Sequence, residues 1–283
     1  MNINADVFNY SDYRAFLKSY YTDKKAQSKK FTFSLFAAMT GFSSPSFLKL
    51  VMEGKKNLTK PSVLKIVRGL RLRKKPAQYF EDLVFFNQAA SLEDKSYFLD
   101  RINKFRKKNK PEKLLSADYD YLRQWYHCVI REMIDLPDFK EDPHWIAKKL
   151  LHTVRADDIA GSLKFMEEKG FIGRDAKGAL IKKDKTIATG PIGEEEMLNT
   201  IVRAFHRKMV RYAEDSLANQ PKDVRNTSNT TLSLSEKSYE IVTRRIEQLR
   251  MEILEIAKSD MTVDRIYQLN INVFPWTKGT SDD

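Results

Sequence analysis

The sequence of 283 residues has one cysteine, Cys128, and no long apolar run. A single cysteine excludes an internal disulfide framework and a multi-cysteine zinc site. No stretch approaches the ~18 uninterrupted apolar residues that a membrane span requires. The N-terminal residues also lack the basic and then apolar run of a secretory signal. We therefore expect a soluble protein of a reducing, bacterial-type cytoplasm, with no membrane among its partners.

Sequence signatures of catalysis are missing as well. None of the four histidines forms a metal-binding pair at helical spacing with another ligand. His127 and Cys128 are neighbours, so on a helix their side chains point in different directions, which disfavours a catalytic dyad. The loop 190–193 lacks the lysine of a P-loop and the preceding strand of a dinucleotide fold, and no Gly-x-Ser-x-Gly elbow occurs. We expect no enzyme activity, catalytic residue, metal site or cofactor.

The whole chain has a net charge of +12, and its positive charge is concentrated at the N-terminal end. Residues 1–75 contain 16 lysines and arginines against four acidic residues, a net charge of +12, whereas residues 111–283 contain 27 basic and 29 acidic residues. This asymmetry is typical of a polyanion-binding head on a neutral body. A solvated basic face with no partner would have the same charge.

Hydrophobic spacing predicts a mainly α protein with small β elements (α+β). Before a proline-containing hinge at 136–143, helices are expected at residues 10–22, 32–40, 45–53, 60–70, 76–89, 92–108 and 116–134. Beyond the hinge, the pattern predicts helices at 145–151 and 156–169, a hairpin of residues 170–174 and 179–182, and a helix from 194 to about 218. The last predicted elements are strands at 230–234 and 266–274 around a helix that Ser235 caps.

Residues 33–52 have the spacing of two helices joined by a tight turn. Gly41 suits the turn, where a positive φ is cheap only for glycine. Ala37 lies four residues earlier, as a small residue must where two helices cross closely. Ser43 or Ser44 can cap the second helix, whose first position is Pro45. The inward face of the pair is predicted to hold Phe42, Phe47 and Leu50.

This layout resembles the phage-repressor type of helix-turn-helix over roughly residues 32–72. The resemblance implies that the second helix, at about 45–53, enters the major groove of double-stranded DNA. The candidate base contacts are Ser44, Ser46 and Lys49. The candidate phosphate contacts are Lys55, Lys56, Asn57 and Lys60. A three-helix packing unit with no ligand is the alternative interpretation.

A basic run follows this motif and allows two interpretations. It could add contacts to the DNA backbone, or it could form the cationic last turn of a helix, which the helix dipole favours. The run comprises Arg68, Arg71, Arg73, Lys74 and Lys75.

Residues 143–189 resemble a winged helix, with two short helices before a β-hairpin wing. Helix 156–169 has four acidic and two basic residues, a balance that would repel phosphates. We therefore interpret this part as a structural or signal-receiving winged domain. The wing keeps the alternative of DNA contact open because it is basic. Its basic residues are Arg174, Lys177, Lys182, Lys183 and Lys185.

The chain as a whole resembles a bacterial family of uncharacterised proteins that join an N-terminal helix-turn-helix to a domain of unknown function. The most specific stretches are DPHWIAKKL at 142–150 and RIYQLNINVFP at 265–275. The resemblance spans roughly residues 8–278 and implies a transcriptional regulator. The predicted parts are a helix-turn-helix domain at 1–110, a linking or dimerisation helix at 111–136, a winged-helix-like domain at 137–192, and a C-terminal strand-helix-strand domain for dimerisation or sensing at 193–283.

The last helix contains a seam of coiled-coil type, formed by Tyr239, Val242, Ile246, Leu249, Ile253 and Ile256. Packing of this seam on a sheet of its own domain is the alternative, with the two strands parallel through a right-handed crossover. Because two-fold binding doubles the contacts of a small helix-turn-helix, we expect a homodimer whose interface lies at 114–134 or 236–257.

The sequence therefore predicts a homodimeric, sequence-specific DNA-binding transcriptional regulator. A second class of function is a receptor or adaptor, in which the body binds a small effector or a protein and DNA contact is secondary. A nucleotide messenger would be held by a basic helix face, which solvation alone explains more simply. That face comprises Arg203, Arg207, Lys208 and Arg211.

Overall fold

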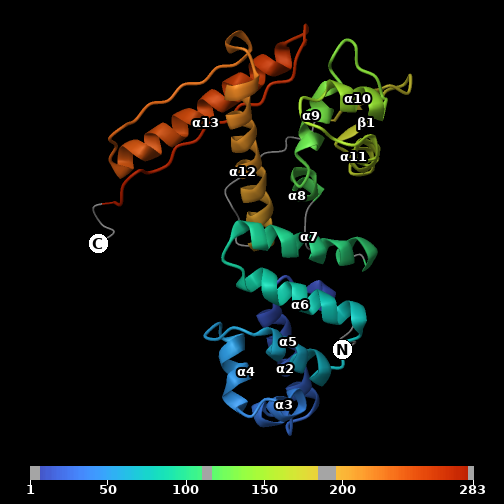
Figure 1. Cartoon of the computed structure of the whole chain (residues 1–283), viewed down its shortest axis with the longest axis vertical. Coiled ribbons are helices and arrows are strands. Elements are labelled where there is room, and N and C mark those ends of the chain that lie inside the picture. The colour runs from blue at the N-terminus through green and yellow to red at the C-terminus, as the bar shows by residue number, and fades with distance from the viewer. Residues whose placement is uncertain (1–6, 110–116, 184–195, 280–283) are drawn as a thin grey trace. The chain divides into compact units, whose positions relative to one another are not determined.

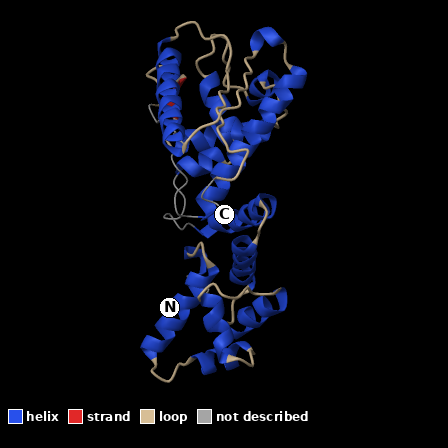
Figure 2. Cartoon of the chain, turned by 90° about the vertical axis from the view of Figure 1, so that its left-hand side faces the viewer, coloured by secondary structure: helices blue, strands red, loops and turns tan. Residues whose placement is uncertain are grey.

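The computed structural model describes residues 7–109, 117–183 and 196–279. Within these ranges the chain is mainly helical with one small sheet, as Figure 2 shows. This confirms the prediction of a mainly α protein with small β elements. No single helix in these ranges is long and apolar enough to cross a membrane, and the bent pair Phe33–Thr40 and Pro45–Met52 has that length and composition only when taken together.

The chain divides into two compact units, residues 1–123 with 187–204 and residues 124–186 with 205–283. The helices of the first unit begin where side chains satisfy free backbone amides. Asp12, Thr32, Thr59 and Ser91 each accept a hydrogen bond from an amide two or three residues further on. The elements are η1 (Val7–Asn9), α2 (Tyr13–Gln27), α3 (Phe33–Thr40), α4 (Pro45–Met52), α5 (Lys60–Gly69), α6 (Lys74–Gln88), α7 (Leu92–Asn109) and α8 (Ala117–Leu122).

The core of the first unit is aromatic and aliphatic. Tyr13, Phe16 and Leu17 of α2 are fully buried, and the ring of Phe16 lies 5.7 Å from that of Phe80 in α6. α6 packs along α7, as Figure 1 shows. α4 contacts α2 and α3, while α5 contacts α3 and α6. The short helices α3, α4 and α5 are therefore anchored on this core by apolar burial.

α3 and α4 are joined by a four-residue turn and are bent by 98° relative to each other. Gly41 ends α3 in the left-handed conformation, with φ at 73°. The amide of Phe42 donates to the carbonyl oxygen of Ala37 at 2.9 Å, which completes the helix end. The predicted role of Gly41 in a tight turn is thus confirmed.

The predicted inward face of this helix pair is wrong by one residue in α4. Leu48 and Val51 are fully buried, whereas Phe42, Phe47 and Leu50 are only half-buried. The rings of Phe42 and Phe47 lie 4.8 Å apart and cover each other at the edge of the core. Phe47 and Leu50 have the same helical spacing as Leu48 and Val51. Only the packing against α2 and α3 therefore decides which pair is buried.

A close helix crossing occurs at Gly69, at the end of α5. A Cβ atom there would lie 2.7 Å from the carbonyl oxygen of Met39 and 2.7 Å from the Cα of Thr40. The backbones of α3 and α5 therefore approach so closely that only glycine fits.

The second unit begins with three helices and a hairpin: α9 (Trp125–Met133), α10 (Pro143–Lys149), α11 (Ala156–Glu168), β1 (Ile172–Arg174) and β2 (Leu180–Lys182). The strands are antiparallel with Gly173 opposite Ile181, which confirms the predicted hairpin. Asp175 accepts hydrogen bonds from the amides of Lys177 and Ala179 at 2.8 and 2.9 Å. This Asx-type turn fixes where the two strands meet.

The predicted single helix at 116–134 is wrong, because the chain forms α8 and α9 with a break at residues 123–124. Gln124 has an extended backbone, with φ at −115° and ψ at 112°. The break coincides with the boundary between the two units. Trp125 is buried in the second unit, so α9 starts a new core and does not extend the old one.

The chain ends with α12 (Glu196–Asn219), η2 (Lys222–Val224) and α13 (Glu236–Ser259). Ser235 caps α13 by accepting from the amide of Ser238 at 3.2 Å, as predicted. The predicted strands at 230–234 and 266–274 are wrong for the described chain, because both segments lack regular secondary structure. Neither has a partner strand there, so the strand-helix-strand domain with its parallel crossover does not form.

Candidate functional site

The N-terminal end of α4 is an exposed polar surface. Ser44 and Ser46 face solvent there, and so does Lys49 one turn further along the helix. The Ser44 hydroxyl makes a 2.9 Å hydrogen bond with the Ser46 hydroxyl and does not cap the helix. The first turn of α4 contains no acidic residue. Its amide groups and the positive end of its dipole can therefore meet an anion without a competing carboxylate.

One carboxylate, that of Glu53, lies among the basic side chains beside α4. The Lys55 Nζ lies 2.9 Å from Glu53 Oε2, and the Lys49 Nζ lies 3.9 Å from Glu53 Oε1. The hydrogen bond from Lys55 is the main cause that lowers the pKa of Glu53. Two lysines share this one negative charge, so the cluster keeps a net positive charge. Because exposed ion pairs are weak, a phosphate could replace Glu53 as the partner of either lysine.

The loop between α4 and α5 carries the remaining candidate phosphate contacts. Lys55, Lys56, Asn57 and Lys60 are all exposed. The Asn57 Oδ1 accepts a 2.7 Å hydrogen bond from Arg14 Nη2, which ties the loop to α2. The structure thus places all seven candidate residues at the surface, just before and on α4, on this loop and at the start of α5. Lys49 and Lys55 are brought together by Glu53.

Two residues that hold this surface in place were not predicted. Arg14 contacts Asn57 from 43 positions away, and its guanidinium lies 4.5 Å from the centre of the Tyr13 ring. Gln88, the last residue of α6, bonds to both backbone groups of Leu58. Such contacts join distant segments, and no local spacing signals them.

The basic run after α5 is partly a helix end. Arg71 has a φ of 54°, the left-handed conformation that usually belongs to glycine at this position. The amide of Leu72 donates to the carbonyl oxygen of Val67 at 3.0 Å. Arg68, Arg71, Lys74 and Lys75 are exposed, so their side chains are also available to an anion.

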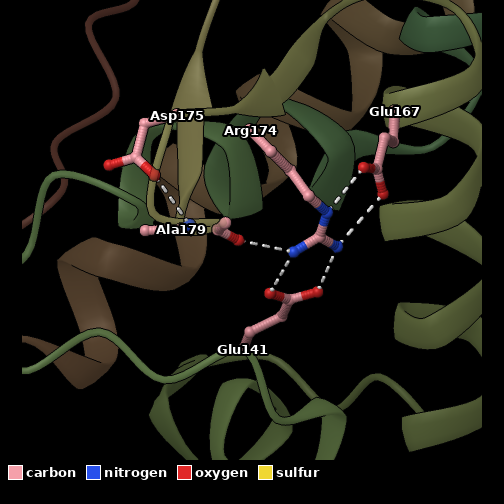
Figure 3. A network of polar contacts seen from close by, with 6 residues as sticks. Glu141, Glu167, Arg174, Asp175 and Ala179 are labelled. Carbon is pink, nitrogen blue, oxygen red and sulfur yellow. Dashed lines mark hydrogen bonds and ion pairs between the residues drawn. The ribbon is translucent and has the colours of Figure 1, made fainter.

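The hairpin of the second unit differs from the α4 surface, because carboxylates of the same unit form ion pairs with two of its basic side chains. Figure 3 shows Arg174 between two glutamates. Its Nη2 lies 2.8 Å from Glu141 Oε1 and its Nε lies 2.8 Å from Glu167 Oε1. These hydrogen bonds raise the pKa of Arg174. Lys182 is paired with Glu132 at 2.6 Å and with Asp135.

Burial lowers the pKa of Lys182, but hydrogen bonds to Asp135 and Glu132 outweigh it and leave the pKa above its usual value. Lys177 and Lys183 are exposed, and Lys185 lies outside the described residues. Two of the four described cations of the wing are therefore committed within the protein.

The basic face predicted for an effector lies on α12. Arg203, Arg207, Lys208 and Arg211 are exposed, and in the described part of the chain no carboxylate pairs with them. The ammonium of Lys208 lies 5.9 Å from the centre of the Tyr212 ring. Burial, and then the charge of Arg211, lowers the pKa of Lys208. Across the described ranges, no group of three or more histidine, cysteine or acidic residues could hold a metal ion.

Comparison with known proteins identifies one family. The model of a domain of unknown function, DUF4423, matches residues 105–276. Neither the curated proteins nor the solved structures contain a match to this chain.

Proposed function

The chain belongs to the DUF4423 family, whose description names no activity, and we propose that it is a sequence-specific transcriptional regulator that reads double-stranded DNA with α4. The matched region starts at residue 105, after α3 and α4. The proposal therefore depends on the geometry and charge of the N-terminal unit.

The observation that carries the proposal is the arrangement of α3 and α4. A helix-turn-helix joins two helices at about 90–120° through a turn of three or four residues that often contains glycine. Here the helices are bent by 98°, and the four residues 41–44 between them begin with Gly41. In such motifs the second helix lies in the major groove with its N-terminal residues at the base edges. The exposed Ser44 and Ser46 lie at the N-terminal end of α4, and Lys49 lies one turn further along the helix.

Electrostatics support the same proposal. Phosphate contacts supply most of the non-specific affinity for DNA and set the register of the protein on the duplex. Lys55, Lys56 and Lys60 are exposed around the loop after α4. Residues 1–75 of the chain, which include them, carry 16 basic and four acidic side chains. Small hydroxyl side chains at the helix start allow close approach, while lysine reaches base or phosphate acceptors.

The test is selection of duplexes from a randomised pool by the full-length protein, followed by fluorescence anisotropy with the selected and a scrambled sequence. We expect an enriched sequence and an affinity that falls steeply between ~50 and ~200 mM salt. Lys60→Ala should lower the slope of the logarithm of affinity against the logarithm of salt concentration by about one, as expected for the loss of one phosphate contact. Lys169→Ala, which removes an exposed lysine of the second unit, is the matched control and should change nothing. Failure to enrich any sequence would refute the proposal.

A further inference from the structure

The C-terminal arm, defined here as residues 225–278, is almost entirely exposed although it is rich in apolar side chains. α13 has 24 residues and buries none of them. Six of its large apolar residues expose between 38% and 68% of their surface. These are Tyr239, Ile241, Leu249, Met251, Leu254 and Ile256. At about 100° per residue they point to every side of the helix. Large apolar side chains left exposed on several sides of a helix indicate that a partner covers it.

The segments before and after α13 have the pattern of strands without the pairing. Figure 1 shows them drawn out along α13. Apolar residues alternate at Tyr267, Leu269, Ile271 and Val273. No backbone–backbone hydrogen bond involves residues 226–234 or 263–278 in the described chain. One side-chain bond, from Asn270 Nδ2 to the carbonyl oxygen of Met209, ties the last segment to α12. Their backbone groups are therefore open to another strand.

The size of the exposed surface matches that of a stable dimer. Fifteen large apolar side chains between Leu232 and Trp276 are exposed. At up to ~200 Å² for each fully exposed side chain, they present on the order of 1,500 Å². A specific interface takes about 800 Å² from each partner, so the arm exposes enough apolar surface for one.

The charge of the arm indicates which partner covers it. α13 has five acidic and five basic residues, and several pair along the helix, as Arg250 does with Glu247 at 2.6 Å and Lys258 with Glu255 at 2.7 Å. Such a surface neither attracts a strongly charged partner nor repels its own copy. Two-fold symmetric pairs are the commonest assemblies of soluble proteins.

We propose that a second copy of this chain covers the C-terminal arm, with α13 of one copy enclosed by the arm of the other. The segments 226–234 and 263–274 pair as β-strands across the two copies. This proposal is independent of DNA binding, because it depends only on the exposed apolar area, the open backbone groups and the charge balance of the arm.

Analytical ultracentrifugation of the full-length protein without DNA tests this assembly. The expected result is a mass twice that of the 33.0 kDa chain. Leu249→Glu combined with Ile256→Glu should shift the mass to that of one chain while the helical signal in circular dichroism is retained, because both side chains are exposed within one copy. Leu151→Glu is the control, since Leu151 is 81% exposed outside the arm, and it should leave the dimer intact.

Hydrogen exchange gives a second measurement on the same samples. Amides of 226–234 and 263–274 should be protected in the dimer and exchange rapidly in the monomeric double variant. A wild-type mass of one chain, or a dimer that the double variant does not dissociate, would overturn the proposal. Protection that persists in the monomeric variant would also overturn it, because the strands would then pair within one chain.

Discussion

Gln88 holds both backbone groups of Leu58 with its side-chain amide. The amide of Leu58 donates to Gln88 Oε1 at 2.7 Å, and Gln88 Nε2 donates to the Leu58 carbonyl oxygen at 2.8 Å. Gln88 Oε1 also accepts from the Tyr13 hydroxyl at 2.8 Å. The end of α6 thus fixes the loop that carries Lys55 and Lys56, so a residue 30 positions further along the chain helps to position the proposed DNA surface.

Gln88→Ala should lower the free energy of unfolding by about 1–3 kcal/mol, because the backbone groups of the buried Leu58 lose their partners. Gln78→Ala, on the exposed side of the same helix, should stay within about 0.5 kcal/mol of wild type. Urea denaturation measures both variants, and hydrogen exchange should report faster exchange at the Leu58 amide in Gln88→Ala only. Equal effects of the two variants would contradict the assigned role.

Gly69→Ala should destabilise the protein by about 1–3 kcal/mol, because its methyl group would overlap the backbone of α3. Gly161→Ala in α11 is the matched comparison, since no atom lies within 4 Å of its added Cβ. That variant should gain about 0.5–1 kcal/mol from helix propensity. Thermal unfolding of the two variants should therefore shift in opposite directions. A shift in the same direction would show that the crossing of α3 and α5 is looser than described.

The candidate base contacts and phosphate contacts should separate in DNA-binding measurements. Ser46→Ala combined with Lys49→Ala should reduce the preference for the selected sequence over a scrambled one by roughly tenfold, about 1.4 kcal/mol. Lys56→Ala should weaken binding to both sequences alike and reduce the salt slope by about one. Anisotropy titrations at several salt concentrations distinguish the two. Equal losses on both sequences in the double variant would remove Ser46 and Lys49 from the set of base contacts.

Glu53→Gln should strengthen binding to every DNA sequence severalfold. The substitution removes the carboxylate that Lys49 and Lys55 share and that would repel phosphates. Glu93→Gln, at the start of α7, removes the same charge from the same unit and is the control for net charge. If both variants gain equally, the effect is long-range and Glu53 has no special place beside the DNA.

Stability should depend on pH through Asp82, which is 1% exposed in α6. Burial raises the pKa of Asp82 to about 6, and the ion pair with Arg101 opposes this rise only in part. Because the folded state then binds more protons than the unfolded state between about pH 4 and pH 6, this residue's contribution decreases as the pH rises through that window. Urea denaturation from pH 4 to 7 measures the free energy of unfolding of wild type and of Asp82→Asn. The difference between the two should change only between about pH 4 and pH 6.

Local signals predicted much of the N-terminal unit. The glycine at position 41 and the proline at position 45 mark helix ends within a residue or two, because the chemistry of helix ends acts over three or four positions. The hairpin was likewise predictable from the turn at Asp175–Gly178.

Other features depend on contacts that a local pattern does not contain. The apolar spacing of 116–134 continues without interruption through the break at Gln124. α8 ends there because the chain passes from the core of the first unit to that of the second. The choice between Leu48 and Phe47 as the buried residue depends on what α2 and α3 present to α4. Gln88 and Leu58 are separated by 30 positions, so only the folded chain brings them together.

The open segments on either side of α13 also affect how the isolated chain behaves during production. Unsatisfied strand edges act as templates for amyloid-type stacking when chains are crowded. The segment of alternating apolar residues is bracketed by Asp264 and Arg265 at one end and by Pro275 at the other. Charges and proline in such flanking positions act as gatekeepers against aggregation. Replacing Asp264, Arg265 and Pro275 with apolar residues should therefore produce inclusion bodies.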